Sequence, residues 1–545
     1  MNEPLEIYDT TLRDGTQGLA VNFTSEDKVA IARRLDAFGV DLIEGGWPGS
    51  NPKDVSFFER MRDVPLVNAR LTAFGSTCRR DSAAEEDENL IRLLEVGTEV
   101  VTIFGKSWTM HVTHALGVSL EENLSMIERS VSFLRSNGRE VVYDAEHFFD
   151  GYRADPEYAL ATLAAAAGAG ASTLVLCDTN GGTLPAEVGA RIREVRDRFG
   201  LPVGIHAHND SELAVANSLA AVEAGASQVQ GTINGYGERC GNANLISIVP
   251  NLAFKLGRPQ PQRLSGLREL SRFVDERANL QPNVRAAFVG DAAFAHKGGI
   301  HVSAVNKRPE TYEHLAPELV GNSRRVLLSE LSGRANVLAK SQEYGEEFSA
   351  GGSASRDVVS RLKELENRGY AFEGAEASFQ LLSRKVRGDY RPYFTLHGFS
   401  VIMDKREGES EPRCEAVIKL EVGGVLEHTA SDGQGPVNAL DRALTKALSR
   451  FYPAVEALRL VDYKVRVLDG PETGTAAVVR VQLETSDGDE TWGTVGASFD
   501  IINASYEALL DALEYKLHKD GVVPLEPAAA ARADGAARER VVGRA

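Results

Sequence analysis

The chain is poor in cysteine, has no excess of basic residues and lacks an apolar run that reads as a membrane span. Its four cysteines in 545 residues are scattered: Cys78, Cys177, Cys240 and Cys414. This spacing excludes a disulfide framework and a paired-cysteine metal site, and it fits a reducing compartment. The formal net charge of −18 argues against a nucleic acid or an anionic membrane as partner, because phosphate groups are bound by basic surfaces.

No segment predicts export or insertion into a membrane. The first residues lack the basic and apolar regions of a signal peptide. The uncharged run 160–177 contains Gly168 and Gly170, so we interpret it as a helix, a glycine stop and a buried strand. With 43% hydrophobic and 25% charged residues, the composition is that of a globular protein. We therefore expect a cytoplasmic protein of roughly two to four domains.

The first half of the chain repeats one pattern, in which a glycine ends a helical stretch and an apolar strand follows. The pattern starts at Gly39, Gly97, Gly170 and Gly225. A glycine just past a helix takes the left-handed conformation easily, and the apolar run suits a strand of a parallel sheet that is buried on both faces. Further apolar runs lie before and between these four segments. Together they predict strands near residues 5–9, 41–46, 70–75, 100–105, 140–146, 173–178, 202–207 and 228–234.

Eight β–α units over about 255 residues match the size of a (β/α)8 TIM barrel. The alternative is a doubly wound open sheet, which normally carries a glycine-rich phosphate loop after its first strand. Residues 14–18 read Asp-Gly-Thr-Gln-Gly and do not form such a loop. We therefore predict an α/β protein whose residues 1–258 form a TIM-barrel catalytic domain.

Polar residues gather where the predicted strands end. They are Asp9, Arg13, Asp14, Glu44, Asp144, Glu146, Asp178, Thr179, His206, His208, Glu238, Arg239 and Asn242. In a TIM barrel the active site lies at the carboxyl ends of the strands. Each residue alone could cap a helix or face solvent, but residues from five or more strands converging on one face indicate a functional site.

His206 and His208 stand one residue apart, so in a strand both side chains point the same way. A pair of hydrogen-bonded histidines is the structural alternative, and the surrounding polar residues favour a metal. We predict a divalent cation (Mg, Mn, Co or Zn) held by Asp14, His206, His208 and Asn242. A 2-oxo acid would chelate the ion through its open positions, and Arg13 would bind the carbonyl oxygen as it becomes an alkoxide.

Three motifs carry a family resemblance. Residues 9–17 read Asp-Thr-Thr-Leu-Arg-Asp-Gly-Thr-Gln, residues 206–210 read His-Ala-His-Asn-Asp, and residues 237–242 read Gly-Glu-Arg-Cys-Gly-Asn. The first resembles the signature of the DRE-TIM metallolyase superfamily. The set resembles its Claisen-condensing branch, which contains the 2-isopropylmalate, homocitrate and citramalate synthases. The resemblance implies the same metal-binding and alkoxide-binding roles, with acetyl-CoA as co-substrate.

The resemblance also implies roles for residues outside the metal set. Glu146 is similar to an acid/base residue of the family, and Thr179 to a threonine that contacts the substrate carboxylate. The segment 294–301 resembles the helical subdomain motif, from which His296, together with Tyr312, would reach the active site of the partner subunit. His296 and His301 could instead be partly buried helix contacts. The substrate-binding residues that we expect are Arg13, Glu44, Phe104, Asp144 and Thr179, and the catalytic ones are Arg13, Glu146, His296 and Tyr312.

Within this branch, residues 104–108 and 111–113 most resemble the citramalate synthases. A large residue at Phe104 would shrink the pocket to fit the methyl group of pyruvate. We therefore expect an acyltransferase that condenses acetyl-CoA with pyruvate to citramalate and CoA, in isoleucine biosynthesis. The alternative is 2-isopropylmalate formation from 2-oxoisovalerate, in leucine biosynthesis. An acyl-CoA lyase is a second alternative that invites comparison with Cys240, although the residues around Cys240 follow the synthase pattern.

The second half predicts two further domains. Residues 259–390 read as a helical linker subdomain, and residues 391–523 contain two copies of a strand-strand-strand-helix unit. This repeat resembles the regulatory and dimerisation domain of the synthases, which implies a homodimer. Helix N-termini with glycine-rich loops favour the carboxylate of an amino-acid effector, isoleucine first and leucine second, although the loops could be only tight turns. We expect the tail, residues 524–545, to be disordered.

Overall fold

The computed structural model describes residues 5–258, 263–328, 332–343, 354–408, 410–468 and 474–526. The tail that we expect to be disordered lies outside the described residues, apart from 524–526. The chain divides into two compact units. Unit 1 comprises Met1–Phe294 and His314–Arg324, and unit 2 comprises Ala295–Glu313 and Arg325–Ala545. Each unit is described by itself.

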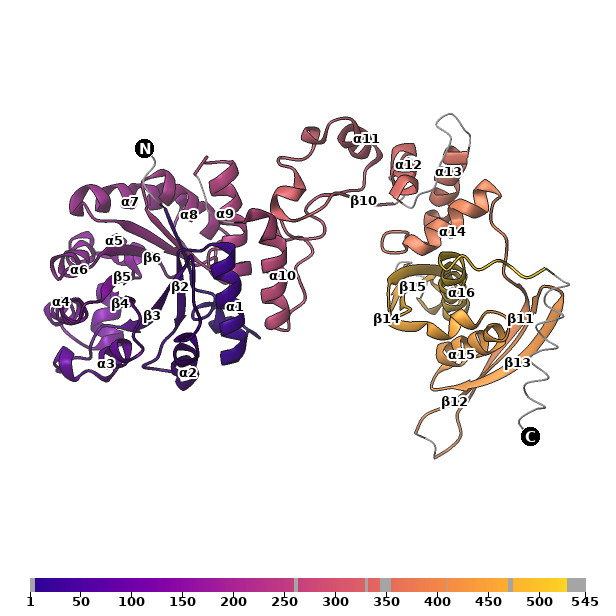
Figure 1. Cartoon of the computed structure of the whole chain (residues 1–545), viewed down its shortest axis with the longest axis horizontal. Coiled ribbons are helices and arrows are strands. Elements are labelled where there is room, and N and C mark those ends of the chain that lie inside the picture. The colour runs from indigo at the N-terminus through magenta and orange to yellow at the C-terminus, as the bar shows by residue number, and fades with distance from the viewer. Residues whose placement is uncertain are drawn as a thin grey trace. The chain divides into compact units, whose positions relative to one another are not determined.

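Unit 1 is a closed barrel of eight parallel strands (Figure 1). The strands are β1 (Glu6–Asp9), β2 (Leu42–Gly46), β3 (Arg70–Ser76), β4 (Val100–Lys106), β5 (Glu140–Glu146), β6 (Thr173–Asp178), β7 (Val203–Ala207) and β8 (Gln228–Gly231). The strands follow one another in chain order around the barrel, and β8 pairs with β1 to close it. Closure confirms the predicted TIM barrel and excludes the open sheet.

Helices surround these strands in Figure 1. They are α1 (Ser25–Phe38), α2 (Pro52–Met61), α3 (Glu88–Glu95), α4 (Leu120–Ser136), α5 (Phe148–Ala154), α6 (Pro156–Gly168), α7 (Pro185–Phe199), α8 (Ala214–Glu223), α9 (Leu245–Phe254) and α10 (Leu267–Arg277). Helix α1 shows how the sequence sets such bounds. Thr24 and Asp27 form a capping box at its start, and Gly39 ends it with a φ of 102°.

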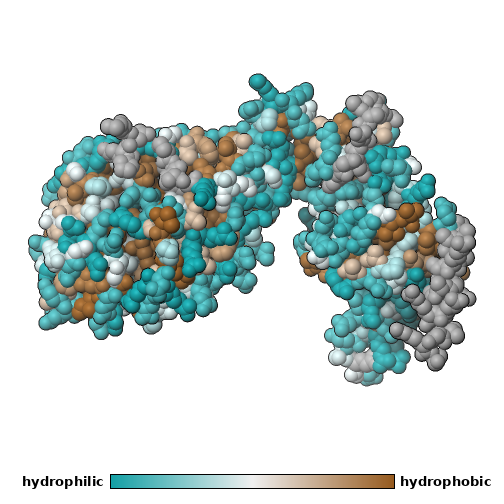
Figure 2. All heavy atoms as spheres, in the orientation of Figure 1, coloured by the Kyte–Doolittle hydropathy of each residue, from teal (hydrophilic) through white to brown (hydrophobic). Residues whose placement is uncertain are grey.

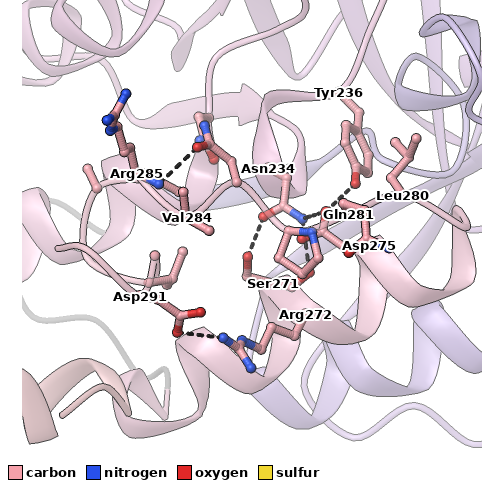
Figure 3. Close-up of a pocket in the computed structure, with 17 residues that line it drawn as sticks. Asn234, Tyr236, Ser271, Arg272, Asp275, Leu280, Gln281, Val284, Arg285 and Asp291 are labelled. Atoms are coloured by element: carbon pink, nitrogen blue, oxygen red, sulfur yellow. Dashed lines mark hydrogen bonds and ion pairs between the residues drawn. The ribbon is translucent and has the colours of Figure 1, made fainter. Parts of the chain in front are cut away.

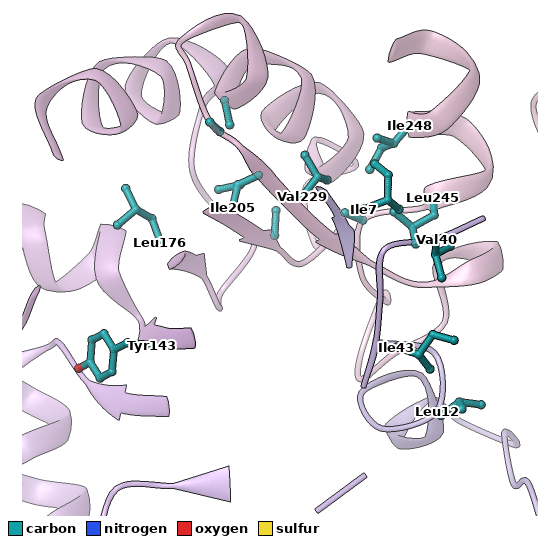
Figure 4. Packing of buried hydrophobic residues seen from close by; sticks show 14 of the residues in the cluster. Ile7, Leu12, Val40, Ile43, Tyr143, Leu176, Ile205, Val229, Leu245 and Ile248 are labelled. Carbon is teal, nitrogen blue, oxygen red and sulfur yellow. The ribbon is translucent and has the colours of Figure 1, made fainter. Parts of the chain in front are cut away.

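Each barrel strand buries both of its faces. Ile7, Ile43, Ile205 and Val229 belong to the large core cluster between strands and helices (Figure 4). The alternate strand residues Tyr8, Leu42, Val100, Val142 and Val175 form a second buried cluster together with Cys177. Because side chains alternate along a strand, a barrel wall covered on both sides needs apolar residues in both registers. This explains the continuous apolar runs, and it leaves the carboxyl ends of the strands for polar residues.

Unit 2 begins with helices and ends in the predicted repeat. The helices are α11 (Gly299–Lys307), α12 (Arg334–Glu343), α13 (Ala354–Asn367) and α14 (Glu376–Arg387), with the short strands β9 (Ala295–His296) and β10 (Arg325–Val326). The first copy of the repeat is β11 (Thr395–Asp404), β12 (Arg413–Val422), β13 (Val425–Gly433) and α15 (Pro436–Ser449). The second is β14 (Arg459–Val467), β15 (Val479–Ser486), β16 (Thr491–Ser498) and α16 (Ile501–Lys519). Each copy forms a three-stranded antiparallel sheet, and residues of both copies, such as Leu444 and Leu513, share one core.

Hydrophilic residues cover most of the face seen in Figure 2, with apolar residues in smaller patches. Among the described helices, none combines the length and the apolar character that crossing a bilayer requires. The uncharged run 160–177 divides as predicted, because α6 ends at Gly168 and β6 begins at Thr173.

Candidate metal and catalytic site

Three of the predicted metal ligands meet at the rim of the barrel. Asp14 follows β1, His206 lies in β7, and His208 comes directly after that strand. Asp14 Oδ2 lies 3.3 Å from His206 Nε2, and His206 Nε2 lies 3.4 Å from His208 Nε2. The possible ligand atoms of these three buried residues all lie within 4.8 Å of one another. One ion could therefore contact all three.

Asn242, the fourth predicted ligand, comes from the loop after β8 and pairs with His208 as an isolated β-bridge. Its Oδ1 and the Oδ1 of Asp14 are both buried, and neither has a hydrogen-bond partner among the described residues. Buried polar oxygens without a partner are rare in folded proteins and call for an explanation such as a bound ion. Two imidazoles with carboxylate and amide oxygens also make a donor set that suits a divalent cation. The residues present therefore fit a metal.

The surroundings of the cluster keep Asp14 and His208 in the protonation states that bind a metal. Burial by itself raises the pKa of Asp14, but Arg13 and the two histidines outweigh burial and hold it well below its ordinary value. Burial, reinforced by His206, lowers the pKa of His208 to about 4. Asp14 is therefore a carboxylate and His208 a neutral imidazole at neutral pH, as metal binding requires. Burial lowers the pKa of His206, yet Asp14 raises it overall, so a cation and a proton compete for this residue.

Gln230 in β8 orients His206, and the sequence analysis missed it. Its Nε2 donates to Asp144 Oδ1 over 3.1 Å, so its Oε1 faces His206 Nδ1 at 2.9 Å. Because an amide oxygen only accepts, the proton of a neutral His206 sits on Nδ1, and Nε2 keeps its lone pair for the cluster. One sequence feature could have indicated this role. Gln228 and Gln230 are polar and lie on the same face of a short strand whose other residues are valine and glycine.

Arg13 is held in place from two sides. Its Nε donates to Glu44 Oε1 over 2.5 Å, and its guanidinium carbon lies 3.6 Å from the centre of the Phe74 ring. The other oxygen of Glu44 accepts from the Tyr8 hydroxyl over 2.8 Å. Burial opposes the charge of Arg13, but Glu44 and Asp14 raise its pKa above its ordinary value. In this structure Glu44 thus positions Arg13. The predicted contact of Glu44 with substrate stays a prediction.

An aromatic wall flanks Arg13. Phe74 and Phe104 stack with their centres 5.5 Å apart, and Trp47 meets them edge-on at 5.8 and 5.6 Å. Phe104 and Trp47 also line a cavity of about 510 Å³ that extends along the ends of β3 and β4 to Cys78 and Arg79. The sequence motifs point to Phe104 but not to Phe74 or Trp47, because a lone aromatic within an apolar strand (Phe74) or just after one (Trp47) gives no sign of the site.

The remaining predicted residues of unit 1 lie at the ends of β5 and β6. Glu146 forms an ion pair with Lys106 at the end of β4. The hydroxyl of Thr179 accepts from the backbone N–H of His147 over 2.9 Å, which leaves its own proton available for a substrate carboxylate. Burial raises the pKa of Asp144 to about 7. These arrangements permit the predicted roles without testing them.

His296 and Tyr312 belong to unit 2. His296 Nε2 lies 3.0 Å from Glu313 Oε1, and the Tyr312 ring stacks on His301 with centres 4.1 Å apart. The catalytic role of both residues stays a prediction.

Three family models match consecutive parts of the chain. The HMGL-like model matches residues 4–274. The homocitrate synthase post-HMGL domain-like model matches residues 288–370. The LeuA allosteric (dimerisation) domain model matches residues 373–517. This order is the one expected from the barrel, the helical segment and the repeat.

Curated relatives match nearly the whole chain. The (R)-citramalate synthase of Geobacter sulfurreducens is 56% identical and covers 94% of this chain and 98% of its own length. That of Synechocystis is 52% identical, with 94% and 96% covered. A 2-isopropylmalate synthase of Methanocaldococcus jannaschii is 32% identical, with 94% and 95% covered. With its closed barrel, its buried ligand cluster and these full-length matches, the chain belongs to the (R)-citramalate synthase family.

Proposed function

We propose that the chain condenses acetyl-CoA with pyruvate and water to give (R)-citramalate and free CoA, a step of isoleucine biosynthesis. One observation carries the proposal: the buried cluster of Asp14, His206 and His208 lies in a chain that has five full-length (R)-citramalate synthase relatives with 45–56% identity. A relative named as a probable 2-isopropylmalate synthase and one named as a 2-isopropylmalate synthase are 35% and 32% identical, which makes 2-oxoisovalerate the second choice of substrate.

Each residue of the site has a distinct task in this reaction. Asp14, His206, His208 and Asn242 would hold the divalent cation, which supplies Lewis acidity at the 2-oxo group when bound. Arg13 would donate to the carbonyl oxygen of pyruvate and stabilise the negative charge that develops there. Glu146 would take a proton from the methyl group of acetyl-CoA, whose carbon then bonds to the carbonyl carbon. Water cleaves the thioester and releases CoA as a free thiol.

Substrate choice is tested with a panel of 2-oxo acids at saturating acetyl-CoA, by following thiol release. We expect pyruvate to have the highest kcat/KM, because the aromatic wall at Phe104 overpacks against an isopropyl group. The margin over 2-oxoisovalerate should be at least about tenfold, the least that one extra methylene costs in a fitted pocket. A blank without 2-oxo acid corrects for the exposed thiol of Cys240. A higher kcat/KM for 2-oxoisovalerate would make the chain a 2-isopropylmalate synthase.

We also propose that the chain forms a homodimer through the repeat and that an amino acid, isoleucine before leucine, inhibits it there. The match of residues 373–517 to a dimerisation domain supports the dimer. The helices of the two copies of the repeat are capped differently at their first turns. In α16 the Asp500 carboxylate already accepts from the first-turn amides of Ile502 and Asn503. In α15 the N-cap is Gly435, which offers no side chain to the first turn, so these amides suit the carboxylate of an effector.

Gly435→Asp in the full-length chain tests the effector site. Gly435 has extended backbone angles, and a Cβ there would meet no heavy atom within 4 Å among the described residues. An Asp can therefore cap α15 and compete with the effector. We expect the isoleucine concentration for half-inhibition to rise roughly tenfold, a change within the range by which allosteric effectors typically alter affinity. The activity without isoleucine should not change. Gly435→Ala is the control. Unchanged inhibition in Gly435→Asp would place the effector elsewhere.

A further inference from the structure

We propose that Asp275, in α10, is a positioning residue that holds the loop after β8 so that Asn242 presents its side-chain oxygen to the metal cluster. The inference rests on the proposed function only in assuming that a metal binds there. Asp275 is buried and lies outside every motif that carried the family resemblance. Figure 3 shows it beneath Tyr236 and Asn234, at one side of a cavity of about 430 Å³.

Two side chains of the loop bind the same oxygen of Asp275. Asn234 Nδ2 donates to Asp275 Oδ1 over 2.7 Å, and the Tyr236 hydroxyl donates to that oxygen as well. One turn earlier in α10, Ser271 Oγ donates to Asn234 Oδ1 over 2.6 Å. Asn234 Nδ2 also donates to the Ser271 carbonyl over 2.9 Å. Helix α10 therefore clamps the loop at Asn234 and Tyr236 through four hydrogen bonds.

The loop needs this clamp because its backbone is strained at Asn234. The φ of 61° at this residue lies in the left-handed region, which residues other than glycine adopt infrequently and which persists only when the surroundings enforce it. Glycine would adopt this angle freely, but only a side chain such as Asn can bind α10. The bonds to Ser271 and Asp275 offset the strain and fix the direction in which the chain leaves β8.

The clamped segment holds Asn242 directly. The Tyr236 carbonyl accepts from Asn242 Nδ2 over 3.3 Å, and the Gly235 carbonyl accepts from the Asn242 backbone N–H over 3.1 Å. With Nδ2 bound to the loop, the orientation of the amide is set and Oδ1 is left for a ligand. This is the buried Oδ1 that has no hydrogen-bond partner among the described residues. Asp275 thus reaches the metal cluster through one residue, Tyr236.

Asp275 holds the loop through the position of its accepting oxygen rather than through its charge. Both of its donors are neutral, and an amide oxygen accepts two hydrogen bonds as well as a carboxylate oxygen does. Burial raises the pKa of Asp275 above its ordinary value, although the hydrogen bonds from Tyr236 and Asn234 and the charge of Arg272 act in the opposite direction. Because the amide oxygen of asparagine can accept both bonds, Asp275→Asn should keep the clamp, whereas Asp275→Leu removes the oxygen that accepts them. The adjoining cavity gives the leucine room.

The test measures metal affinity of the full-length protein without substrate, by competition between a fluorescent chelator and Mn²⁺ or Co²⁺. We expect Asp275→Leu to raise the metal Kd about 10–100-fold, the range for outer-shell changes, and to alter the Co²⁺ absorption spectrum. Asp275→Asn should restore both to within about threefold of wild type. Asp291→Asn is the matched control, because Asp291 lines the same cavity and binds Arg268 and Arg272 of α10; its metal Kd should not change.

A folded Asp275→Leu with the wild-type metal Kd would overturn the inference. If that variant does not fold, Tyr236→Phe decides, since it removes one bond to Asp275 and keeps the ring; a wild-type Kd in Tyr236→Phe then overturns it. Failure of the proposed function looks different. A wild-type chain that binds metal but prefers another 2-oxo acid leaves the inference intact, and one that binds no metal removes the premise of both.

Discussion

His206→Ala is expected to leave the purified protein without stoichiometric metal and without measurable condensation. The substitution removes the central ligand of the cluster, whose Nε2 lies 3.3 Å from Asp14 Oδ2 and 3.4 Å from His208 Nε2. Losing a direct ligand should weaken metal binding by more than the roughly 10–100-fold that outer-shell substitutions cost. Without the ion, pyruvate loses both its anchor and the polarisation of its carbonyl group. Asp14→Ala should behave in the same way.

Metal analysis of the purified variants and titration of the Kd, combined with the thiol-release assay, measure this result. His428→Ala is the control, because His428 lies in β13 with its side chain exposed. It should keep full metal content and turnover. Normal turnover of His206→Ala at full metal occupancy would remove His206 from the ligand set and, with it, the proposed chemistry.

Glu146→Gln is expected to lose most of kcat while the KM for pyruvate changes little. A positioned base that takes a proton from the acetyl methyl group contributes roughly 10²–10⁴-fold to the rate. The glutamine keeps the size of the side chain but cannot accept that proton. In the structure Glu146 pairs with Lys106 at the end of the neighbouring strand, which keeps its carboxylate at the rim of the barrel, where the substrates would bind.

The control is Glu140→Gln, at the opposite end of the same strand β5. Glu140 forms an ion pair with Arg70 over 2.6 Å, so the variant also neutralises a paired glutamate but far from the rim. Its kcat should stay within about twofold of wild type, because an exposed ion pair contributes at most about 1 kcal/mol to stability. A large rise in the KM for pyruvate with an unchanged kcat in Glu146→Gln would instead assign Glu146 to substrate binding.

The sequence by itself determined the barrel and the pairing of the two histidines. Each barrel strand carries a local signal, an apolar run that often follows a helix-ending glycine, so strands such as Glu140–Glu146 and Thr173–Asp178 were predicted residue for residue. The strand period of two places His206 and His208 on one face. Parallel strands in a closed barrel bring their carboxyl ends to one rim, which is why Asp14, 192 positions before His206 (206 − 14), could be assigned to the same site.

Only the tertiary structure decided which side chains hold the site residues in place. Glu44 binds Arg13, Gln230 orients His206, and Asp275 binds the loop that carries Asn242. Each of these bonds joins separate elements of the chain, and its existence depends on strand register and on how a helix packs against a loop. A buried glutamine or aspartate gives the same local pattern whether it positions a ligand or merely satisfies its own hydrogen bonds. The partners of such residues come from the packing of the folded chain, which local periodicity does not encode.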